Sequence, residues 1–306
     1  MEPKNSIEPG IEIPPEEIHR PVLRDEVLDL LQIEPNQDFI DGTLGLGGHA
    51  AAILERSAPE GRLLGIDRDR QALALAERRL APFAKRVIYR HGTFDRSADL
   101  LRELGWTEVH GMILDLGVSS LQLDDARRGF SFLQDSALDM RMDLEEEVTA
   151  RELLDDLPEK ELEAIFRDYG EERFARRIAR QIVRSRESAP LRTTRELCQR
   201  VSRAVPFSKS RIHPATRVFQ ALRIAVNREL DLLKKFLSRE PDFIRVGGVL
   251  AVISFHSLED RIVKQAFRSF KNFQILTKKP LQAGPQEIQA NPRSRSAKLR
   301  AVRRMS

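Results

Sequence analysis

The sequence predicts an α/β protein in which a mostly parallel sheet is interrupted by an all-helical segment. Three short apolar runs, each ending in an aspartate, indicate the sheet: Phe39–Asp41, Gly65–Asp67 and Met112–Asp115. A glycine cluster and an alanine-rich helix follow the first run, which is how parallel αβα sheets present their ligand-binding edge. From Ala150 to Val205 the apolar spacing is helical without a strand pattern, which indicates the helical segment.

Up to Leu116 the chain alternates predicted strands and helices. Apolar residues at helical spacing predict helices at Pro21–Leu31, Ala50–Arg56 and Arg70–Leu80. Short apolar runs predict strands at Asp38–Asp41, Arg62–Asp67, Val87–Arg90 and Met112–Leu116. This alternation is typical of a parallel sheet. Residues 119–145 are irregular and polar, so the alternation stops after the fourth strand.

Helix follows helix in the middle of the chain. Arg173–Arg184 predicts a helix with its arginines on one side and Phe174, Ile178 and Ile182 on the other. Thr193–Glu196 matches a capping box that opens the next helix. We expect one long helix from about Pro214 to Leu237, because its leucines keep helical spacing throughout.

The strand pattern resumes at Gly248–Ser254, and a helix to about Phe270 follows. The last two apolar runs, Phe273–Thr277 and Lys298–Arg303, predict a closing antiparallel hairpin. Both ends of the chain therefore contribute to one sheet domain. We expect residues 1–125 and 214–306 to form this domain and residues 126–213 to form an inserted helical domain.

Composition narrows the class of protein. At 306 residues, 41% hydrophobic and 32% charged, the chain is expected to be globular. No apolar run approaches the roughly 18–20 residues of a membrane span, and Met1–Pro15 does not resemble a signal peptide. The single cysteine, Cys198, excludes an intrachain disulfide framework, and the six scattered histidines lack metal-ligand spacing. We therefore expect a cytoplasmic protein without a bound metal.

Charge is distributed unevenly along the chain. The net charge is only +4, from 51 basic and 47 acidic residues, but Asn291–Ser306 holds six basic residues and no acidic one. Arg173, Arg177, Arg180 and Arg184 follow one another at spacings of 4, 3 and 4, which places them along one side of a helix. Either segment alone is most often a solvated surface. Together they favour a polyanionic partner, nucleic acid above all.

The glycine cluster leaves two cofactors open. Gly45–Ala50 matches the dinucleotide pattern G-x-G-x-x-[GA], and Asp67 follows Gly45 by 22 residues, as expected for a ribose-binding acid. Asp41 favours S-adenosylmethionine over NAD, because an acid before the glycines can hold the methionine ammonium but would repel a pyrophosphate. The closing hairpin also suits the antiparallel strand of methyltransferase sheets. An NAD-dependent oxidoreductase remains the alternative on these grounds.

Several longer motifs resemble successive blocks of one family. In chain order they are His19–Val22, Asp41–His49, Gly65–Asp69, His91–Phe94, Asp115–Asp124, Asp139–Asp143, Arg211–Ile224, Ser254–Val263 and Asn291–Leu299. The group they resemble is the bacterial 16S ribosomal RNA cytosine-N4 methyltransferases of the MraW type. The match runs from about His19 to Arg304 in the same order, and one departure is Leu121, where the family pattern has proline.

This resemblance implies a fold, a reaction and a set of contacts. It implies a class I S-adenosylmethionine-dependent methyltransferase domain, Rossmann-like, with an inserted helical domain for substrate recognition. It further implies methyl transfer to the exocyclic amine of a decoding-region cytosine in 16S ribosomal RNA, within the small ribosomal subunit. The cofactor contacts that it implies are Gly47, Gly48, His49, Asp67, Phe94, Asp115 and Gln122, to which the strand pattern adds Asp41 and Gly45.

The candidate catalytic residues follow the fourth predicted strand. A cytosine amine is a poor nucleophile, because its lone pair is delocalised into the ring, so an acceptor for its hydrogens would help. Asp115, Ser119 and Ser120 lie where the methyl must be delivered. The alternatives are a purely cofactor-binding carboxylate for Asp115 and loop caps for the serines. Carbon-5 methylation would need a thiolate, and Cys198 lies on an apolar helix face.

Further candidates concern the RNA. Arg127, Arg128, Arg141, Arg217 and the basic tail at residues 291–304 are candidate phosphate contacts. His256 and Glu259 are expected to border the base pocket, unless this turn is only a helix cap formed by its neighbours Ser257 and Asp260. A catalytically silent RNA-binding assembly factor with the same fold remains an alternative to an enzyme.

Overall fold

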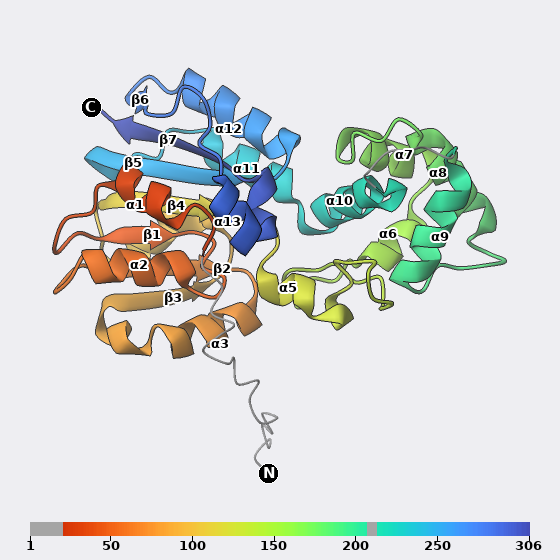
Figure 1. Ribbon diagram of the computed structural model, residues 1–306, viewed down its shortest axis with the longest axis horizontal. Coiled ribbons are helices and arrows are strands. Elements are labelled where there is room, and N and C mark those ends of the chain that lie inside the picture. The colour runs from red at the N-terminus through yellow and green to blue at the C-terminus, as the bar shows by residue number, and fades with distance from the viewer. Residues whose placement is uncertain (1–20, 207–212) are drawn as a thin grey trace, which may run out of the picture.

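A computed structural model describes residues 21–206 and 213–306 of the chain. His19, Arg20, Arg211 and Ile212 of the family-like blocks, and the segment Met1–Pro15, lie outside the described residues. Figure 1 shows a sheet domain beside a separate group of helices, which we term the helical module. The sheet has seven strands in the order β3-β2-β1-β4-β5-β7-β6. The strands are β1 Phe39–Asp41, β2 Leu63–Asp67, β3 Val87–His91, β4 Val109–Asp115, β5 Ile244–Ser254, β6 Phe273–Ile275 and β7 Lys298–Arg304.

Strand direction confirms the predicted fold class. β1 pairs in parallel with β2 and β4, β2 with β3, and β4 with β5. β7 is antiparallel to both β5 and β6, so the predicted closing hairpin is also confirmed. The α-helices are α1 Arg24–Leu31, α2 Gly48–Arg56, α3 Arg70–Arg79, α4 Ser97–Glu103, α5 Ser120–Asp124, α6 Ala150–Asp156, α7 Glu159–Asp168, α8 Ala175–Ser185, α9 Thr194–Ala204, α10 Pro214–Asn227, α11 Glu229–Leu237, α12 Ser257–Ser269 and α13 Pro285–Ala290.

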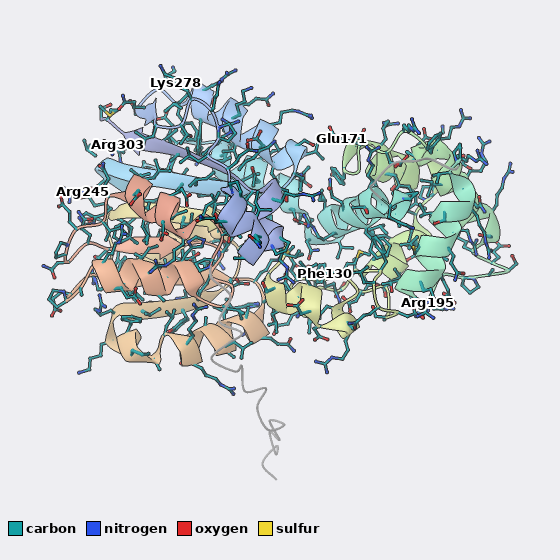
Figure 2. The ribbon with its side chains drawn as sticks, viewed as in Figure 1. Phe130, Glu171, Arg195, Arg245, Lys278 and Arg303 are labelled. Carbon is teal, nitrogen blue, oxygen red and sulfur yellow. The ribbon has the colours of Figure 1, made fainter. Side chains whose placement is uncertain are left out.

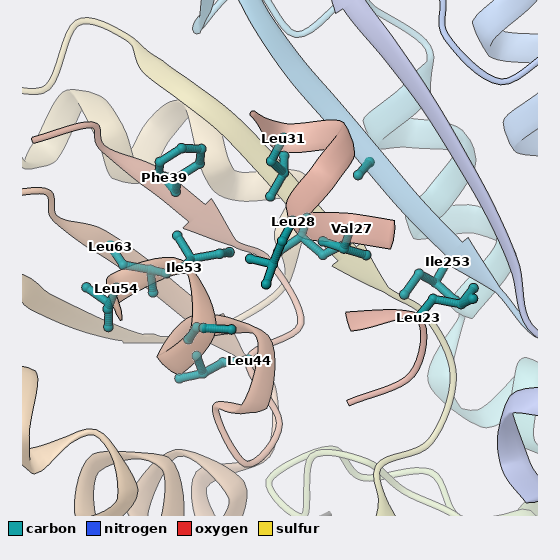
Figure 3. Packing of buried hydrophobic residues seen from close by; sticks show 14 of the residues in the cluster. Leu23, Val27, Leu28, Leu31, Phe39, Leu44, Ile53, Leu54, Leu63 and Ile253 are labelled. Carbon is teal, nitrogen blue, oxygen red and sulfur yellow. The ribbon is translucent and has the colours of Figure 1, made fainter. Parts of the chain in front are cut away.

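The sheet is the middle of three layers, because its strands are apolar on both faces. One face packs against α1 and α2, where Val27, Leu28 and Ile53 meet Phe39 and Leu63 (Figure 3). The opposite face packs against α4, α11 and α12. Its buried side chains include Leu101, Leu233, Phe267, Met112 and Leu250. Burial on both faces explains why the strands appear in the sequence as continuous apolar runs.

The strand order reverses between β1 and β4, and this places the acidic strand ends together. β2 and β3 lie on one side of β1, and β4 and β5 lie on the other. Asp41 is in register with Gly65 of β2 and Ile113 of β4. Parallel strands end at the same edge of a sheet, and ligands bind where the order reverses. Asp41, Asp67 and Asp115 therefore lie around a single crevice.

The helical module has its own apolar core. Leu154 of α6, Phe166 of α7, Ile178 of α8 and Leu197 of α9 are fully buried and belong to one cluster. Leu222 and four further buried residues of α10 belong to the same cluster. On packing, α10 belongs with the helical module, whereas the sequence prediction assigned it to the sheet domain by ending the insertion at residue 213. The reason is that the buried face of α10 contacts α6, α7 and α9.

The helical predictions need correction in two respects. The long helix expected over 214–237 is two helices, because Arg228 between α10 and α11 has φ 52, a left-handed conformation that ends a helix. The short helices α4, α5 and α13 were not predicted, and α5 lies in the segment expected to be irregular. The Arg173–Arg184 helix and the capping box at Thr193 are confirmed as α8 and the start of α9.

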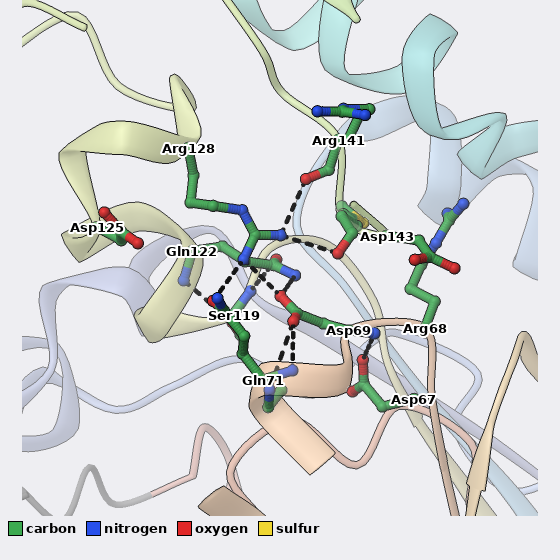
Figure 4. Close-up of polar contacts among 12 residues, drawn as sticks. Asp67, Arg68, Asp69, Gln71, Ser119, Gln122, Asp125, Arg128, Arg141 and Asp143 are labelled. Atoms are coloured by element: carbon green, nitrogen blue, oxygen red, sulfur yellow. Dashed lines mark hydrogen bonds and ion pairs between the residues drawn. The ribbon is translucent and has the colours of Figure 1, made fainter. Parts of the chain in front are cut away.

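A buried polar network joins the start of the helical module to the sheet domain (Figure 4). The Arg128 guanidinium lies 2.9 Å from an Asp69 carboxylate oxygen, and both side chains are almost fully buried. Its other nitrogen donates to the carbonyl oxygens of Arg141 and Met142. Asn227 at the end of α10 accepts from the Met142 amide and donates to the Met140 carbonyl. The chain therefore enters and leaves the module through fixed contacts.

Candidate active site

A cavity of about 380 Å³ opens at the crevice where the strand order reverses. The loops after β1, β2, β3 and β4 form its floor, and the contributing residues include Gly45, Asp67, Phe94 and Asp115. The opposite wall comes from α10, α11 and the start of α12, and a C-terminal segment closes one side. The cavity is thus bounded by both parts of the fold.

The loop after β1 is shaped by glycines. Gly45 and Gly47 have φ values of 51 and 75, which favour glycine over any residue with a Cβ. A Cβ on Gly47 would also lie 3.0 Å from the side chain of Leu80. Gly47 is the N-cap of α2, so the loop directs the start of that helix toward the cavity. The amides of Gly45 and Gly47 already donate to Asp67 and Leu44, so the first amides of α2 are the ones suited to a negatively charged or polar ligand group.

Asp67 holds this loop and faces the cavity. Its carboxylate accepts the Gly45 amide at 2.7 Å and the Asp69 amide at 2.8 Å. Burial raises the pKa of Asp67 to about 6, although these two hydrogen bonds act to lower it. At neutral pH the carboxylate is mostly ionised and has lone pairs left to accept ligand hydroxyls.

Asp41, His49 and Asp115 form a charged cluster beneath the loop. The His49 Nε2 atom lies 3.7 Å from Asp115 Oδ2, and Asp41 accepts the Thr43 amide at 3.2 Å. Burial raises the pKa of Asp41 to about 7; His49 lowers it, while the charges of Asp115 and Asp67 add to the increase. Asp41 is 1% exposed and does not line the cavity. Its charge therefore acts from behind the loop.

Unpaired polar atoms mark the floor of the cavity. Among the described residues, both ring nitrogens of His49 and Oδ1 of Asp115 are buried without a hydrogen-bond partner. A buried polar atom without a partner costs about 1–3 kcal/mol, so such atoms usually have a role that requires them. Both side chains line the cavity. The donor and acceptor atoms fit a polar, partly cationic ligand beside a ribose-binding carboxylate.

The three polar residues after β4 differ in what they contact. Ser119 caps α5, because its hydroxyl accepts the Gln122 amide and its own amide donates to the Gln122 side chain. The Gln122 amide nitrogen donates to Asp69 Oδ2 at 2.9 Å. Gln122 therefore uses both ends of its side chain to fix the loop. Ser120 lines the cavity beside them.

The opposite wall contains charged residues that the sequence prediction did not include as site residues. Arg223 of α10 donates two hydrogen bonds to Glu229 of α11, at 2.9 and 3.0 Å. Burial acts to lower the pKa of Arg223, but the nearby carboxylates of Glu229 and Glu259 raise it above its usual value. An arginine inside an otherwise apolar helix was the available signal. The sequence prediction missed the pair because it treated α10 and α11 as one straight helix. The bend at Arg228 brings Glu229 back toward Arg223.

Glu259 and His256 form the cap of α12 themselves. Glu259 accepts the amides of Phe255 and His256, and the His256 ring accepts the Glu259 amide. Glu259 lines the cavity, as expected, but His256 does not. The alternative cap by Ser257 and Asp260 is wrong, because Ser257 donates to Glu171 of the helical module and Asp260 binds Arg300.

The C-terminal segment after α13 closes one side of the cavity. Asn291, Arg293 and Ser296 line it. Arg293 donates to Asp124 of α5 at 2.7 Å, and Glu287 accepts the Leu23 amide at 2.7 Å. These contacts join residues more than 160 positions apart in the chain. Part of the basic tail is thus structural rather than a free surface.

Comparison with known proteins identifies the family. Residues 16–305 match the model of the MraW methylase family. The chain belongs to this family. A ribosomal RNA small subunit methyltransferase H from Syntrophotalea carbinolica is 53% identical, with 94% of this chain and 98% of the relative covered. A protein of the same name from a Cyanothece species is 52% identical, with 96% and 97% covered.

Membership of the MraW methylase family settles the class of enzyme. The protein is an S-adenosylmethionine-dependent methyltransferase, and the oxidoreductase and silent-factor alternatives are excluded. An rRNA methylase of solved structure from Streptococcus thermophilus is 12% identical with a TM-score of 0.40, covering 92% of this chain and 94% of that chain. That likeness is too distant to add to the argument. Within the described residues, no helix has the length and apolar character to cross a membrane.

The structure brings most of the predicted site residues of this methyltransferase to the cavity. Those that line it are Gly45, Gly48, His49, Asp67, Phe94, Asp115, Ser119, Ser120 and Gln122. Gly47 and Asp41 support the same loop from behind. Phe94 packs edge-on against Phe236 of α11, with ring centroids 5.6 Å apart. These positions agree with the predictions, and the roles of the residues stay proposals.

Three of the predicted phosphate contacts are paired with carboxylates of the protein itself. Arg128 is 3% exposed and is held by Asp69, so the interpretation of Arg128 as a surface contact is wrong. Arg127 pairs with Asp125, and Arg141 with Asp139.

Among the described residues, one group of side chains has atoms placed as metal ligands could be. Ligand-type atoms of His91, Asp143 and Glu145 lie within 4.8 Å of one another, but Arg70 already binds Glu145 through two hydrogen bonds. The absence of a bound metal stays a prediction.

Proposed function

We propose that this protein methylates the exocyclic N4 amine of a cytosine in the decoding region of 16S ribosomal RNA, within the small ribosomal subunit in the cytoplasm. The names of the relatives support the polymer, since they are small-subunit ribosomal RNA methyltransferases. The blocks that resemble the cytosine-N4 group support the base and the atom. The modest positive charge of the chain, +4, is compatible with a polyanionic substrate.

One observation carries the proposed chemistry: Asp115 ends β4 with an unpaired, buried carboxylate oxygen in the cavity. S-adenosylmethionine, when bound, supplies an electrophilic methyl group on a sulfonium. An N–H of the cytosine amine would donate to Asp115, which would draw the amine out of conjugation and accept the proton that the nitrogen loses once it carries the methyl group. His49, 3.7 Å from Asp115, would orient the carboxylate and moderate its charge. Positioning and exclusion of water would provide most of the remaining rate enhancement.

The cofactor would lie across the glycine loop. Asp67 would accept the ribose hydroxyls, while Phe94 would pack against the adenine ring. The backbone at Gly45 and Gly48 would approach the ligand closely, because no Cβ intervenes, and Gly47 would shape the loop from behind. Asp41 would attract the methionine ammonium through its charge from behind the loop. Ser119 and Gln122 would hold the loop after β4 in place.

The base would enter from the side of the helical module. A cytosine in folded RNA must leave its stack to reach a buried methyl group. Arg223 and Glu229 lie on the wall opposite the cofactor loops and offer donors and acceptors for the base edge. The helical module would then recognise the surrounding RNA. Cys198 lies in that module and does not line the cavity, which argues against a thiolate route to carbon 5.

The decisive experiment is transfer of tritiated methyl from S-adenosylmethionine to small ribosomal subunits from a strain that lacks the enzyme. Nucleoside mass analysis should place the label on N4-methylcytidine. Naked 16S ribosomal RNA, tested in parallel, distinguishes the assembled subunit from free RNA as substrate. Label on 5-methylcytidine, or no label on RNA, would show that the assignment is wrong.

A further inference from the structure

A second hollow lies on the helical module, and its lining is almost entirely arginine. It has a volume of about 430 Å³ and is formed by Arg173, Phe174, Arg176, Arg177 and Arg180 at the start of α8. None of these residues lines the cavity of the candidate active site. We refer to this feature as the arginine hollow. Figure 1 shows α8 on the helical module, apart from the sheet domain.

The helix geometry explains why the arginines gather there. Ala175, Ile178, Ala179 and Ile182 are buried in the core of the module, so the polar side of α8 must face outward. The charged residues of α8 are all arginines, so its outward side carries positive charge without acidic residues between. Arg176, Arg177 and Arg180 lie within about 6 Å along α8, at ~1.5 Å per residue, and Arg173 lies two residues before its start. Four positive charges are therefore concentrated over two turns.

Most of these four arginines have no acidic partner among the described residues. In the part of the chain that the structure describes, only Arg180 of the four has a carboxylate within ion-pair distance, Glu159 at 3.2 Å. Other arginines of the module, such as Arg151 and Arg195, do pair with nearby carboxylates. Figure 2 shows Arg195 and Glu171 at different sides of the module, with Glu171 toward the sheet domain, where it binds Arg261. The hollow thus groups three arginines without a carboxylate partner in the described ranges, whereas other such arginines of the module, for example Arg192 and Arg203, do not line it.

The floor of the hollow adds a flat, apolar surface. The Arg173 guanidinium carbon lies 4.5 Å from the centre of the Phe174 ring, so the guanidinium stacks on the ring. Stacking holds the guanidinium plane while leaving its N–H groups free for a ligand. Guanidinium groups match phosphate oxygens in bidentate geometry, and stacked aromatic surfaces accept bases. Repeated phosphates are the ligand that several adjacent arginines fit best.

We infer that the arginine hollow binds the phosphodiester backbone of the substrate RNA at a point away from the methylated base. This inference rests on the proposed function, because it assumes an RNA substrate. The hollow contributes affinity and orientation, whereas the cavity performs the chemistry. An acidic segment of a ribosomal protein is the competing occupant, and the experiment separates the two.

The test compares two double variants in the full-length protein. Arg173→Ala/Arg177→Ala removes two charges from the hollow. Arg192→Ala/Arg203→Ala removes two exposed arginines of the same module that do not line it. Binding of a 16S ribosomal RNA fragment that contains the decoding region is measured by fluorescence anisotropy over a range of KCl concentrations. Calorimetric binding of S-adenosylhomocysteine checks that both variants retain the folded cavity.

The binding constant for RNA falls as salt rises, and each phosphate contact on single-stranded RNA adds ~0.7 to the steepness of log K against log salt. Loss of two contacts should therefore make this dependence less steep by about 1.4. The hollow variant should show this change and about a tenfold higher KM for RNA with kcat unchanged, whereas the control should match the wild type. An unchanged slope in the hollow variant, or an equal loss in the control, overturns the inference. Weaker binding to intact subunits with unchanged binding to the fragment also overturns it, in favour of a protein partner. A wild-type protein that neither binds nor methylates RNA refutes the proposed function instead.

Discussion

Charged side chains that line the cavity are buried or partly buried, whereas those on the outer side of α8 are mostly exposed. Asp41, Asp67 and Asp115 occupy the ends of three strands, and burial raises the pKa of Asp41 and Asp67 to about 7 and about 6. The arginines of α8 lie in solvent with little local compensation. Burial makes each charge of the cavity costly to keep and effective at short range. Exposed charges act weakly and together, so single substitutions should have large effects in the cavity and small ones on α8.

The largest effect is expected at Asp115. Asp115→Asn keeps the size of the side chain but removes its charge, and kcat for methyl transfer to small ribosomal subunits should fall about 10³-fold, within the range for a group that assists proton movement. Asp99→Asn, on the exposed side of α4, is the matched loss of charge away from the cavity and should stay within about twofold. Single-turnover assays at saturating cofactor measure both. Equal kcat values for Asp115→Asn and the wild type would show that the methyl is delivered elsewhere.

The buried pair between the two parts of the fold should come next. Arg128→Met leaves the Asp69 carboxylate buried without its partner, and the free energy of unfolding in urea should fall by about 3 kcal/mol. Arg128→Met/Asp69→Asn should recover part of this loss, because the unpaired charge is removed and the N-cap of α3 remains. The exposed Arg203→Met should change the unfolding free energy by no more than about 0.5 kcal/mol. Similar losses at positions 128 and 203 would contradict the contrast between buried and exposed charge.

Asp67 should affect cofactor affinity more than turnover. Asp67→Asn removes a charged acceptor for the ribose hydroxyls, each such hydrogen bond being worth roughly 1.5–3 kcal/mol. The Kd for S-adenosylhomocysteine, measured by calorimetry, should therefore rise about 10- to 150-fold for the loss of one such bond. Asp99→Asn, on the exposed side of α4, provides the same change in charge away from the cavity. Wild-type affinity in Asp67→Asn would mean that the cofactor site has been placed wrongly.

The smallest effect is the dependence on pH, and it has opposite signs for binding and stability. Asp67 and Asp41 are ionised above their pKa values of about 6 and about 7, so affinity for S-adenosylhomocysteine should weaken as the pH falls below about 6. Folding raises both values from 3.8, so it favours the neutral carboxyl. The stabilisation from these groups is complete below about pH 3.8 and is lost as the pH rises through about 6 and about 7.

As the pH falls from about 8 to about 5.5, protonation of Asp41 and Asp67 should therefore stabilise the ligand-free protein. Over the same range its affinity for S-adenosylhomocysteine should decline. Thermal unfolding and calorimetry over this range measure the two trends. Asp67→Asn/Asp41→Asn should flatten both. Parallel trends in the wild type, with stability and affinity rising together, would exclude these carboxyls as the titrating groups.

Strands and glycines were predictable, because their signals are local. Each predicted strand overlaps the observed one, since apolar runs that end in aspartate combine burial and a polar edge within a few residues. Gly45 and Gly47 were predictable as turn residues, and both have positive φ. The position of Asp67 followed from its strand alone.

Contacts between distant segments were not predictable. Arg128 lies in a polar stretch and was interpreted as a surface residue, but Asp69, 59 positions earlier, buries it. Arg223 and Glu229 look like ordinary helix residues until the left-handed Arg228 folds α11 back on α10. The short helices α4 and α13 give too few apolar residues to form a pattern. Such features depend on partners that the sequence brings together only after folding.

The position of the helical module between β4 and β5 has a consequence for biogenesis. β4 is synthesised well before its neighbour β5, because the strands are separated by residues 116–243. Until β5 emerges, β4 is an unpaired edge containing the apolar residues Met112, Ile113 and Leu114. The module has more local contacts than the sheet and can collapse first, leaving this edge open. A nascent chain stalled within the module should consequently aggregate or recruit chaperones, whereas the completed chain, in which β5 covers β4 and β7 covers β5, should not.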